Sequence, residues 1–177
     1  MSLSENIGEV LISEAELAEI NKRLGAQITA DYEGKNLFVV GVLKGSLVFM
    51  ADLIRHIDVP CELDFLSVSS YGDGTVSSGT LKIKKDLEED ITGKNVIVVE
   101  DIIDSGRTLK YLKEDLKGRG AKSVKLCALL SKPARHEVEV EVEYIGYEIP
   151  DEFVVGYGLD YAQKYRNLPY IGIVEFE

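Results

Sequence analysis

The chain has 177 residues, of which 45% are hydrophobic and 29% are charged, a composition typical of one globular domain. Its formal net charge is −11, which argues against nucleic-acid and membrane partners because such surfaces need clustered Lys and Arg. No apolar run approaches the roughly 18 residues that span a bilayer, and residues 1–5 lack the pattern of a secretory signal. Cys61 and Cys127 are isolated. We therefore expect a single cytoplasmic domain over 1–177, with reduced thiols.

Periodic apolar patterns predict helices and strands that alternate along the chain. The first helix is expected to begin at a capping box formed by Ser13 and Glu16 and to end before Gly34. Two further helices, with apolar residues three or four positions apart, are expected at 46–57 and 109–118. Short apolar runs predict strands at 36–43, 63–70, 81–87, 95–99 and 123–130.

Two segments have patterns of a different kind. Residues 71–79 are rich in Gly and Ser and predict a flexible loop. Residues 136–144 alternate Glu with Val and Tyr, which predicts a strand with one buried and one solvated face. We interpret its row of carboxylates as a solvated face that guards against edge pairing, and we assign it no chemistry.

The alternation of strands and helices predicts an α/β fold with a mainly parallel central sheet flanked by helices. Sheets of this kind bind ligands at the carboxyl ends of their strands. Leu43, Val99 and Leu130 each end a candidate strand, and each is followed by polar or charged residues. The sequence therefore predicts a ligand site where these three strand ends meet.

The most informative of these strand ends is the one at Val99. Glu100, Asp101 and Asp104 follow it, and a Ser-Gly-Arg-Thr turn then leads into a helix. That order predicts an anion at the helix N-terminus, where free backbone N–H groups and the helix dipole favour negative charge. The neighbouring carboxylates suit a ligand that also carries hydroxyls, such as ribose, or a divalent metal. A simple surface turn would not explain why like charges crowd together there.

The segment Val98–Thr108 resembles the phosphoribosyl pyrophosphate (PRPP) binding signature of the type I phosphoribosyltransferases. Further segments resemble one branch of that family, the hypoxanthine-guanine phosphoribosyltransferases. They follow the family's order over most of the chain and comprise Leu43–Gly45, Ser69–Gly72, Lys132–Arg135, Phe153–Tyr157, Leu159–Tyr161 and Arg166.

This resemblance implies a type I phosphoribosyltransferase fold with a small hood subdomain, formed largely by residues 137–177 together with the N-terminal residues. It also implies purine salvage: the 5-phosphoribosyl group of PRPP passes to hypoxanthine or guanine, giving IMP or GMP and pyrophosphate. Mg²⁺ is the implied cofactor. The implied assembly is a homodimer or homotetramer.

The resemblance assigns the PRPP site to residues around the acidic pair. Glu100 and Asp101 would hold the ribose hydroxyls, directly or through Mg²⁺, and Asp104 would be the general base near purine N7. The backbone amides and hydroxyls of the following turn would bind the 5-phosphate, a role that falls on Ser105, Gly106, Arg107 and Thr108.

The resemblance also assigns the pyrophosphate site. Lys44 and Gly45 would contact pyrophosphate through a loop with a cis peptide bond at Leu43–Lys44, and Arg135 and Arg166 would add positive charge. Ser70 and Tyr71 would begin a loop that closes over the reacting centre and excludes water.

The resemblance assigns the purine site to Lys132 and to residues in 153–160. Lys132 would donate to the 6-oxo group of the purine, Phe153 would stack on the ring, and Val154 would contact its edge through the backbone. Asp160 would help to hold Mg²⁺. These residues favour 6-oxopurines without ranking hypoxanthine, guanine and xanthine.

Three alternatives remain open. The same fold could act on xanthine or another base, it could serve as a PRPP-responsive regulator that binds nucleic acid, or it could sense PRPP without catalysis. The regulator requires a basic face, which a net charge of −11 disfavours. Assays with several bases and PRPP distinguish the three.

Overall fold

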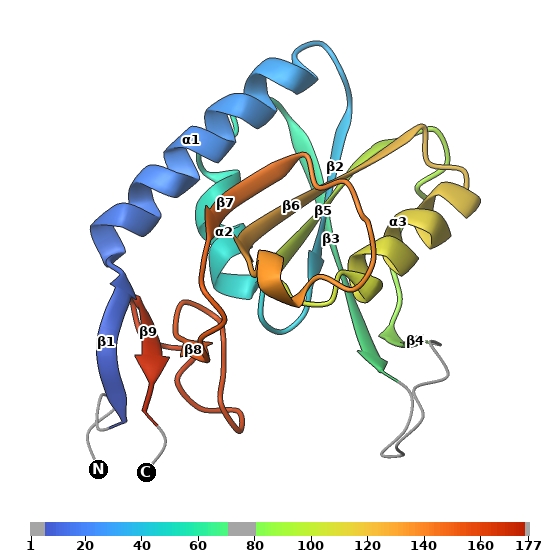
Figure 1. Cartoon of the computed structure of the whole chain (residues 1–177). Helices are drawn as coiled ribbons and strands as arrows, with labels where there is room; N and C mark the ends of the chain where they lie inside the picture. Colours follow the sequence, from blue (N-terminus) through green and yellow to red (C-terminus); the bar gives the residue numbers. More distant parts are fainter. Residues whose placement is uncertain (1–5, 71–80, 176–177) are drawn as a thin grey trace.

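The computed structural model describes residues 6–70 and 81–175. A six-stranded central sheet has the order β4-β3-β2-β5-β6-β7, in which every neighbouring pair is parallel except β3 and β4 (Figure 1). Its strands are β2 (Leu37–Val42), β3 (Cys61–Ser70), β4 (Leu81–Lys85), β5 (Asn95–Ile103), β6 (Ser123–Ser131) and β7 (Tyr144–Glu148). The predicted α/β fold with a mainly parallel sheet is confirmed.

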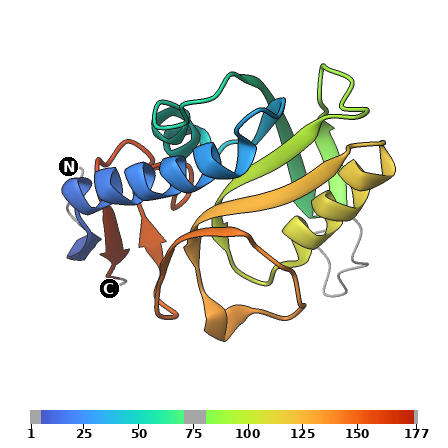
Figure 2. The same ribbon diagram turned by 90° about the horizontal axis from the view of Figure 1, so that it is seen from above.

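Helices cover both faces of this sheet because its central strands are apolar on both sides. In β2, Leu37 and Val39 face one core, whereas Phe38 and Val40 face the other. The first core is covered by α1 (Glu14–Tyr32) and α2 (Leu47–Ile54), and the second by α3 (Arg107–Gly118). Figure 2 shows α3 on the side of the sheet opposite the other two helices.

A second sheet joins the two ends of the described chain. It is antiparallel, with the order β1-β9-β8, and consists of β1 (Ile7–Ile12), β8 (Val154–Val155) and β9 (Ile171–Val174). Figure 1 shows it below α1 and away from β4. We call this sheet, together with the loop 156–170, the hood. Because β7 pairs with β6, part of 137–177 belongs to the central sheet.

The predicted strand boundaries need one correction at β5. This strand does not end at Val99 but continues to Ile103, where it still pairs with Ser131 of β6. The acidic pair Glu100–Asp101 therefore lies within the strand. Continued pairing with β6 satisfies the backbone here, and Ile103 packs in the core on the α3 side.

The strand predicted at 136–144 is wrong, because only Tyr144 at its end belongs to a strand. The segment runs beside α3: the backbone N–H groups of Glu137 and Val138 donate to the Ser105 carbonyl at 3.0 and 3.3 Å. Val140 and Val142 pack against the core on the α3 side, while Glu139 and Glu141 are exposed. The alternation thus indicates a half-buried segment, but the N–H groups of Glu137 and Val138 pair with a turn instead of a neighbouring strand.

The remaining elements match their predictions closely. The capping box of α1 is present, with Glu16 N donating to Ser13 Oγ and Ser13 N donating to Glu16 Oε2. The loop predicted at 71–79 lies outside the described residues, as does Tyr71. Among residues 6–70 and 81–175, no helix combines the length and apolar character needed to cross a membrane.

Candidate active site

The turn between β5 and α3 builds a cavity of about 180 Å³ at the N-terminus of the helix. Gly106 precedes α3 with a φ of 83°. It has no side chain that could compete with an anion for the N–H groups of the first helical turn. Ser105 Oγ accepts from Arg107 N at 3.3 Å. The cavity is lined by Glu100, Asp101, Ile102, Ile103, Asp104, Ser105, Gly106, Thr108 and Leu109.

Gly106 is required for two reasons. A φ of 83° is costly for any residue with a Cβ, and a Cβ here would come within 3.2 Å of Val140 Cγ1. Arg107, although in the same turn, does not line the cavity; its guanidinium forms an ion pair with Glu137 at 2.6 Å. Sequence reasoning missed Glu137 because it assigned the 137–143 carboxylates to a solvated strand face.

A second cavity, of about 200 Å³, shares Asp101, Ile102 and Asp104 with the first. Its other walls come from the end of β6 and from the hood. Phe153 is 43% exposed and meets Tyr161 edge to face, with ring centroids 5.6 Å apart, so the hood presents an aromatic wall. The additional lining residues are Lys132, Phe153, Val154, Leu159 and Asp160.

The acidic pair has unusual electrostatics. Burial raises the pKa of Glu100 well above its usual range, and the charge of Asp101 raises it further. Burial also raises the pKa of Asp101, an effect that a hydrogen bond with Glu100 and the positive charge of Arg166 partly offset. Carboxylates that lie in a cleft and are perturbed by burial and by a neighbouring charge are candidates for a functional site.

The loop after β2 brings a lysine and a glycine to the acidic pair. The Leu43–Lys44 peptide bond is cis, as the resemblance implied. A methyl group on Gly45 would overlap the Asp101 carboxylate, so any other residue there would displace that carboxylate. Lys44 Nζ donates to Gln163 Oε1 at 3.3 Å, which connects this loop to the hood.

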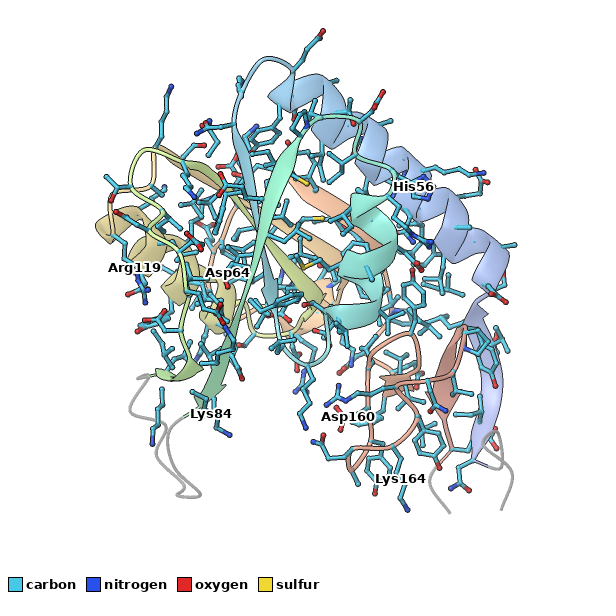
Figure 3. The ribbon with its side chains drawn as sticks, turned by 180° about the vertical axis from the view of Figure 1, so that it is seen from behind. His56, Asp64, Lys84, Arg119, Asp160 and Lys164 are labelled. Carbon is cyan, nitrogen blue, oxygen red and sulfur yellow. The ribbon has the colours of Figure 1, made fainter. Side chains whose placement is uncertain are left out.

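Arg166 and Asp160 lie beside Lys44 and Gln163. Arg166 forms an ion pair with Asp160 at 3.0 Å, and its second guanidinium nitrogen donates to the Gly158 carbonyl at 2.7 Å. Arg166 also donates to Gln163 Oε1 at 3.4 Å. Figure 3 shows Lys164 farther from the central sheet than Asp160. Gln163 was missed because a lone glutamine in a loop carries no motif signal.

Arg135 occupies a different place. It follows Lys132 in a short 3-10 turn, Pro133–Arg135, and its Nε donates to Asp104 Oδ1 at 3.1 Å. Asp151 lies 3.9 Å from the same nitrogen. In this structure Arg135 thus pairs with the carboxylate shared by the two cavities, whereas Lys44 and Arg166 meet at Gln163.

The donor set fits a magnesium ion that is held largely by substrate. No group of three or more His, Cys, Asp or Glu side chains suited to a metal occurs among the described residues, and Asp101 and Asp160 both line the second cavity. Mg²⁺ commonly takes one or two protein carboxylates and completes its octahedron with phosphate oxygens and water.

The fold and these paired cavities define a phosphoribosyltransferase architecture. A family model described as the phosphoribosyl transferase domain matches residues 7–162, and the chain therefore belongs to that family.

Its relatives include the hypoxanthine-guanine phosphoribosyltransferase of Streptococcus pneumoniae, 55% identical over 99% of this chain and 97% of that protein. A crystal structure of a hypoxanthine phosphoribosyltransferase from Staphylococcus aureus has a TM-score of 0.94 and 50% identity, covering 98% of this chain and 94% of that one. The resemblance recognised from the motifs is confirmed.

The chain is also 58% identical, over 99% of its residues, to the bifunctional protein TilS/HprT of Listeria monocytogenes. It spans 27% of the length of that relative.

Proposed function

We propose that this chain is a purine-salvage enzyme that transfers the 5-phosphoribosyl group of PRPP to hypoxanthine or guanine and releases pyrophosphate. The observation that carries the proposal is the pair of cavities sharing Asp101 and Asp104. One cavity has a helix N-terminus suited to a phosphate, and the other has an aromatic wall and a lysine suited to an oxopurine. A ribose bound across the shared residues brings its C1 next to the base.

In this proposal the 5-phosphate binds the α3 N-terminus, and Ser105, Gly106 and Thr108 surround it with amides and hydroxyls. Arg107 contributes charge from outside this cavity, where it also orders Glu137. Glu100 and Asp101 accept hydrogen bonds from the ribose hydroxyls. A buried acidic pair with raised pKa values is suited to neutral or cationic partners, which ribose and a divalent cation supply.

The base binds between Phe153 and the end of β6. Lys132 donates to the 6-oxo group, while the Val154 backbone meets the other edge of the base. Asp104 lines both cavities, so its carboxylate is placed to remove the purine proton at N7 as the base attacks C1. Arg135 orients that carboxylate through their 3.1 Å contact.

Pyrophosphate leaves toward the cluster of Lys44, Gly45 and Arg166. Negative charge grows on the leaving group as the bond at C1 breaks, so fixed cations there stabilise the transition state more than the ground state. Bound Mg²⁺, held by Asp160 and the Glu100–Asp101 pair, would neutralise pyrophosphate oxygens. The loop that Ser70 and Tyr71 begin would exclude water.

The direct test measures pyrophosphate release with PRPP, Mg²⁺ and hypoxanthine, guanine, xanthine or adenine in parallel. Turnover with hypoxanthine and guanine is the expected result. Turnover with xanthine alone would support the alternative base specificity, and no turnover with any base would contradict the transferase.

We also propose that the enzyme works as a homodimer or homotetramer in the cytoplasm. Cys61 and Cys127 are free thiols, which supports a reducing compartment. Light scattering on the purified protein measures the assembly.

A further inference from the structure

Tyr157 has a strained backbone, and its hydroxyl both accepts and donates a hydrogen bond. It adopts a left-handed conformation with a φ of 50°, between Gly156 and Gly158, whose φ values are 100° and 103°. Left-handed backbone is unfavourable for a residue with a bulky side chain. The conformation directs the ring inward, where the side chain is buried, and its hydroxyl meets two polar groups from other elements.

Those two polar groups belong to the helices α1 and α2, which lie outside the hood. Asn21 Nδ2, in α1, donates to the Tyr157 hydroxyl at 2.9 Å. The hydroxyl in turn donates to the carboxylate of Asp52 in α2. Burial raises the pKa of Tyr157, so the hydroxyl stays protonated and keeps donating. One oxygen atom therefore joins the hood to both helices.

The network is connected to the proposed pyrophosphate site, which is the cluster of Lys44, Gly45 and Arg166, through Gly158 and through Asp52. The Gly158 carbonyl accepts from Arg166 at 2.7 Å, and Gly158 N donates back to the Arg166 carbonyl at 3.0 Å. Gly158 also lies so close to the Gly45 carbonyl that a Cβ would not fit. Asp52 lies on α2, which begins directly after the Lys44–Gly45 loop.

Packing alone does not account for this arrangement. Asn21 is 1% exposed, and its Oδ1 has no hydrogen-bond partner among the described residues. A buried polar atom left unpaired is costly, and an apolar side chain of similar size would avoid that cost. The hydrogen bonds of Asn21, Tyr157 and Asp52 are therefore better explained by the position in which they hold the hood against α1 and α2.

We propose that Tyr157 is a positioning residue: its hydroxyl sets the separation between the Lys44–Gly45 loop and the Asp160–Arg166 segment. It thereby controls affinity for the pyrophosphate group of PRPP and of the product, without touching either. This inference rests on the proposed function. It predicts a selective effect, on pyrophosphate and not on the purine.

The test compares Tyr157→Phe with Tyr144→Phe as a matched control. Tyr144 also donates its hydroxyl to a carboxylate, that of Asp31 at 2.5 Å, but this contact joins β7 to α1 and does not involve the hood. The measurements are KM for PRPP, KM for hypoxanthine, the melting temperature, and the Kd of magnesium pyrophosphate by calorimetry.

We expect Tyr157→Phe to raise KM for PRPP and Kd for pyrophosphate by roughly 3- to 10-fold, as for the loss of one buried hydrogen bond. KM for hypoxanthine should stay within about twofold. Tyr144→Phe should lower the melting temperature without changing either KM. Asp52→Asn, which keeps an acceptor for the hydroxyl, should behave like the wild type, whereas Asp52→Ala should behave like Tyr157→Phe.

Unchanged affinity for pyrophosphate in Tyr157→Phe would overturn the inference. So would a parallel rise in both KM values, because that would show a general distortion of the site and not a selective effect on pyrophosphate. Calorimetric binding needs no turnover. A wild-type protein with no transferase activity would therefore overturn the proposed function, and the binding comparison would still decide the role of Tyr157.

Discussion

Asp104 is the residue on which both halves of the proposed reaction depend. It lines the two cavities and accepts a hydrogen bond from Arg135 at 3.1 Å. Asp104→Asn removes the base while keeping the size of the side chain, and should lower kcat by roughly 10²- to 10⁴-fold with a smaller effect on PRPP binding. Steady-state kinetics at neutral pH measure this, and a near-normal kcat would refute the assignment.

In the proposed reaction, Lys132 selects the base. Its backbone N–H donates to the Ile103 carbonyl at 3.0 Å, which holds the residue beside Asp104. An ammonium can only donate, so it matches a 6-oxo acceptor and is left unpaired by the amino group of adenine, a mismatch worth up to ~10⁴-fold. Lys132→Gln should lower kcat/KM for hypoxanthine and guanine, and it should reduce the ratio of these values to kcat/KM for adenine. Unchanged ratios would show that Lys132 does not read the base.

Glu100 links the site to the pH dependence of stability. Burial and then the charge of Asp101 raise its pKa. The folded state therefore binds this proton more tightly than the unfolded state does, and stability falls as pH rises above the unfolded pKa of about 4.3. Glu100→Gln should stabilise the free protein by ~1–2 kcal/mol at pH 7, and the gain should shrink toward pH 4.

Thermal melts at both pH values measure the effect of Glu100→Gln. The exposed Glu139 supplies a control, because Glu139→Gln removes a carboxylate from a solvated segment and should change stability little at either pH. A Glu100→Gln protein less stable than the wild type at pH 7 would contradict the argument.

Among the secondary-structure elements, α1 begins at the capping box that the local sequence predicted. Ser13 Oγ accepts from Glu16 N at 3.2 Å, and Glu16 Oε2 accepts from Ser13 N at 2.7 Å. Ser13→Ala removes the cap and should lower the free energy of unfolding by ~1 kcal/mol, or about 2–4 °C in Tm. Ser13→Asp retains an acceptor and should unfold like the wild type; equal losses in both variants would argue against capping.

The same comparison at 136–144 shows where local reasoning fails. The alternation of Val and Glu correctly indicates one buried and one exposed side, since Val140 packs in the core and Glu139 is exposed. It does not indicate where the backbone hydrogen bonds go. Here the Ser105 carbonyl accepts from the N–H groups of Glu137 and Val138, and that turn is far away in sequence.

For the whole molecule, ligand binding should couple to stability. Mg²⁺ and PRPP together at about 100 times Kd should stabilise the folded protein by ~2.7 kcal/mol, or roughly 5–11 °C in Tm. A chelator should abolish both this shift and turnover, because PRPP carries more negative charge than Lys44 and Arg166 can neutralise. Equal Tm shifts with and without chelator would contradict a magnesium requirement.

Sequence alone determined the alternating elements, the two-sided burial of the central strands and the acidic turn before α3. These features are encoded in residues close together in the chain, where periodicity reports which side chains are buried. It also predicted a ligand site at the ends of β2, β5 and β6, because parallel strands bring those ends together.

Only the tertiary structure decided which distant segments meet. Lys44 contacts Gln163 across 119 positions of sequence, and Asn21 contacts Tyr157 across 136. The pairing of β1 with β9 is equally remote. A local pattern shows that a side chain is buried or charged but not what it faces, since that depends on how the whole chain packs. Gln163 and Tyr157 therefore carried no signal until the hood was in place, and Glu137 carried none until its segment met the turn before α3.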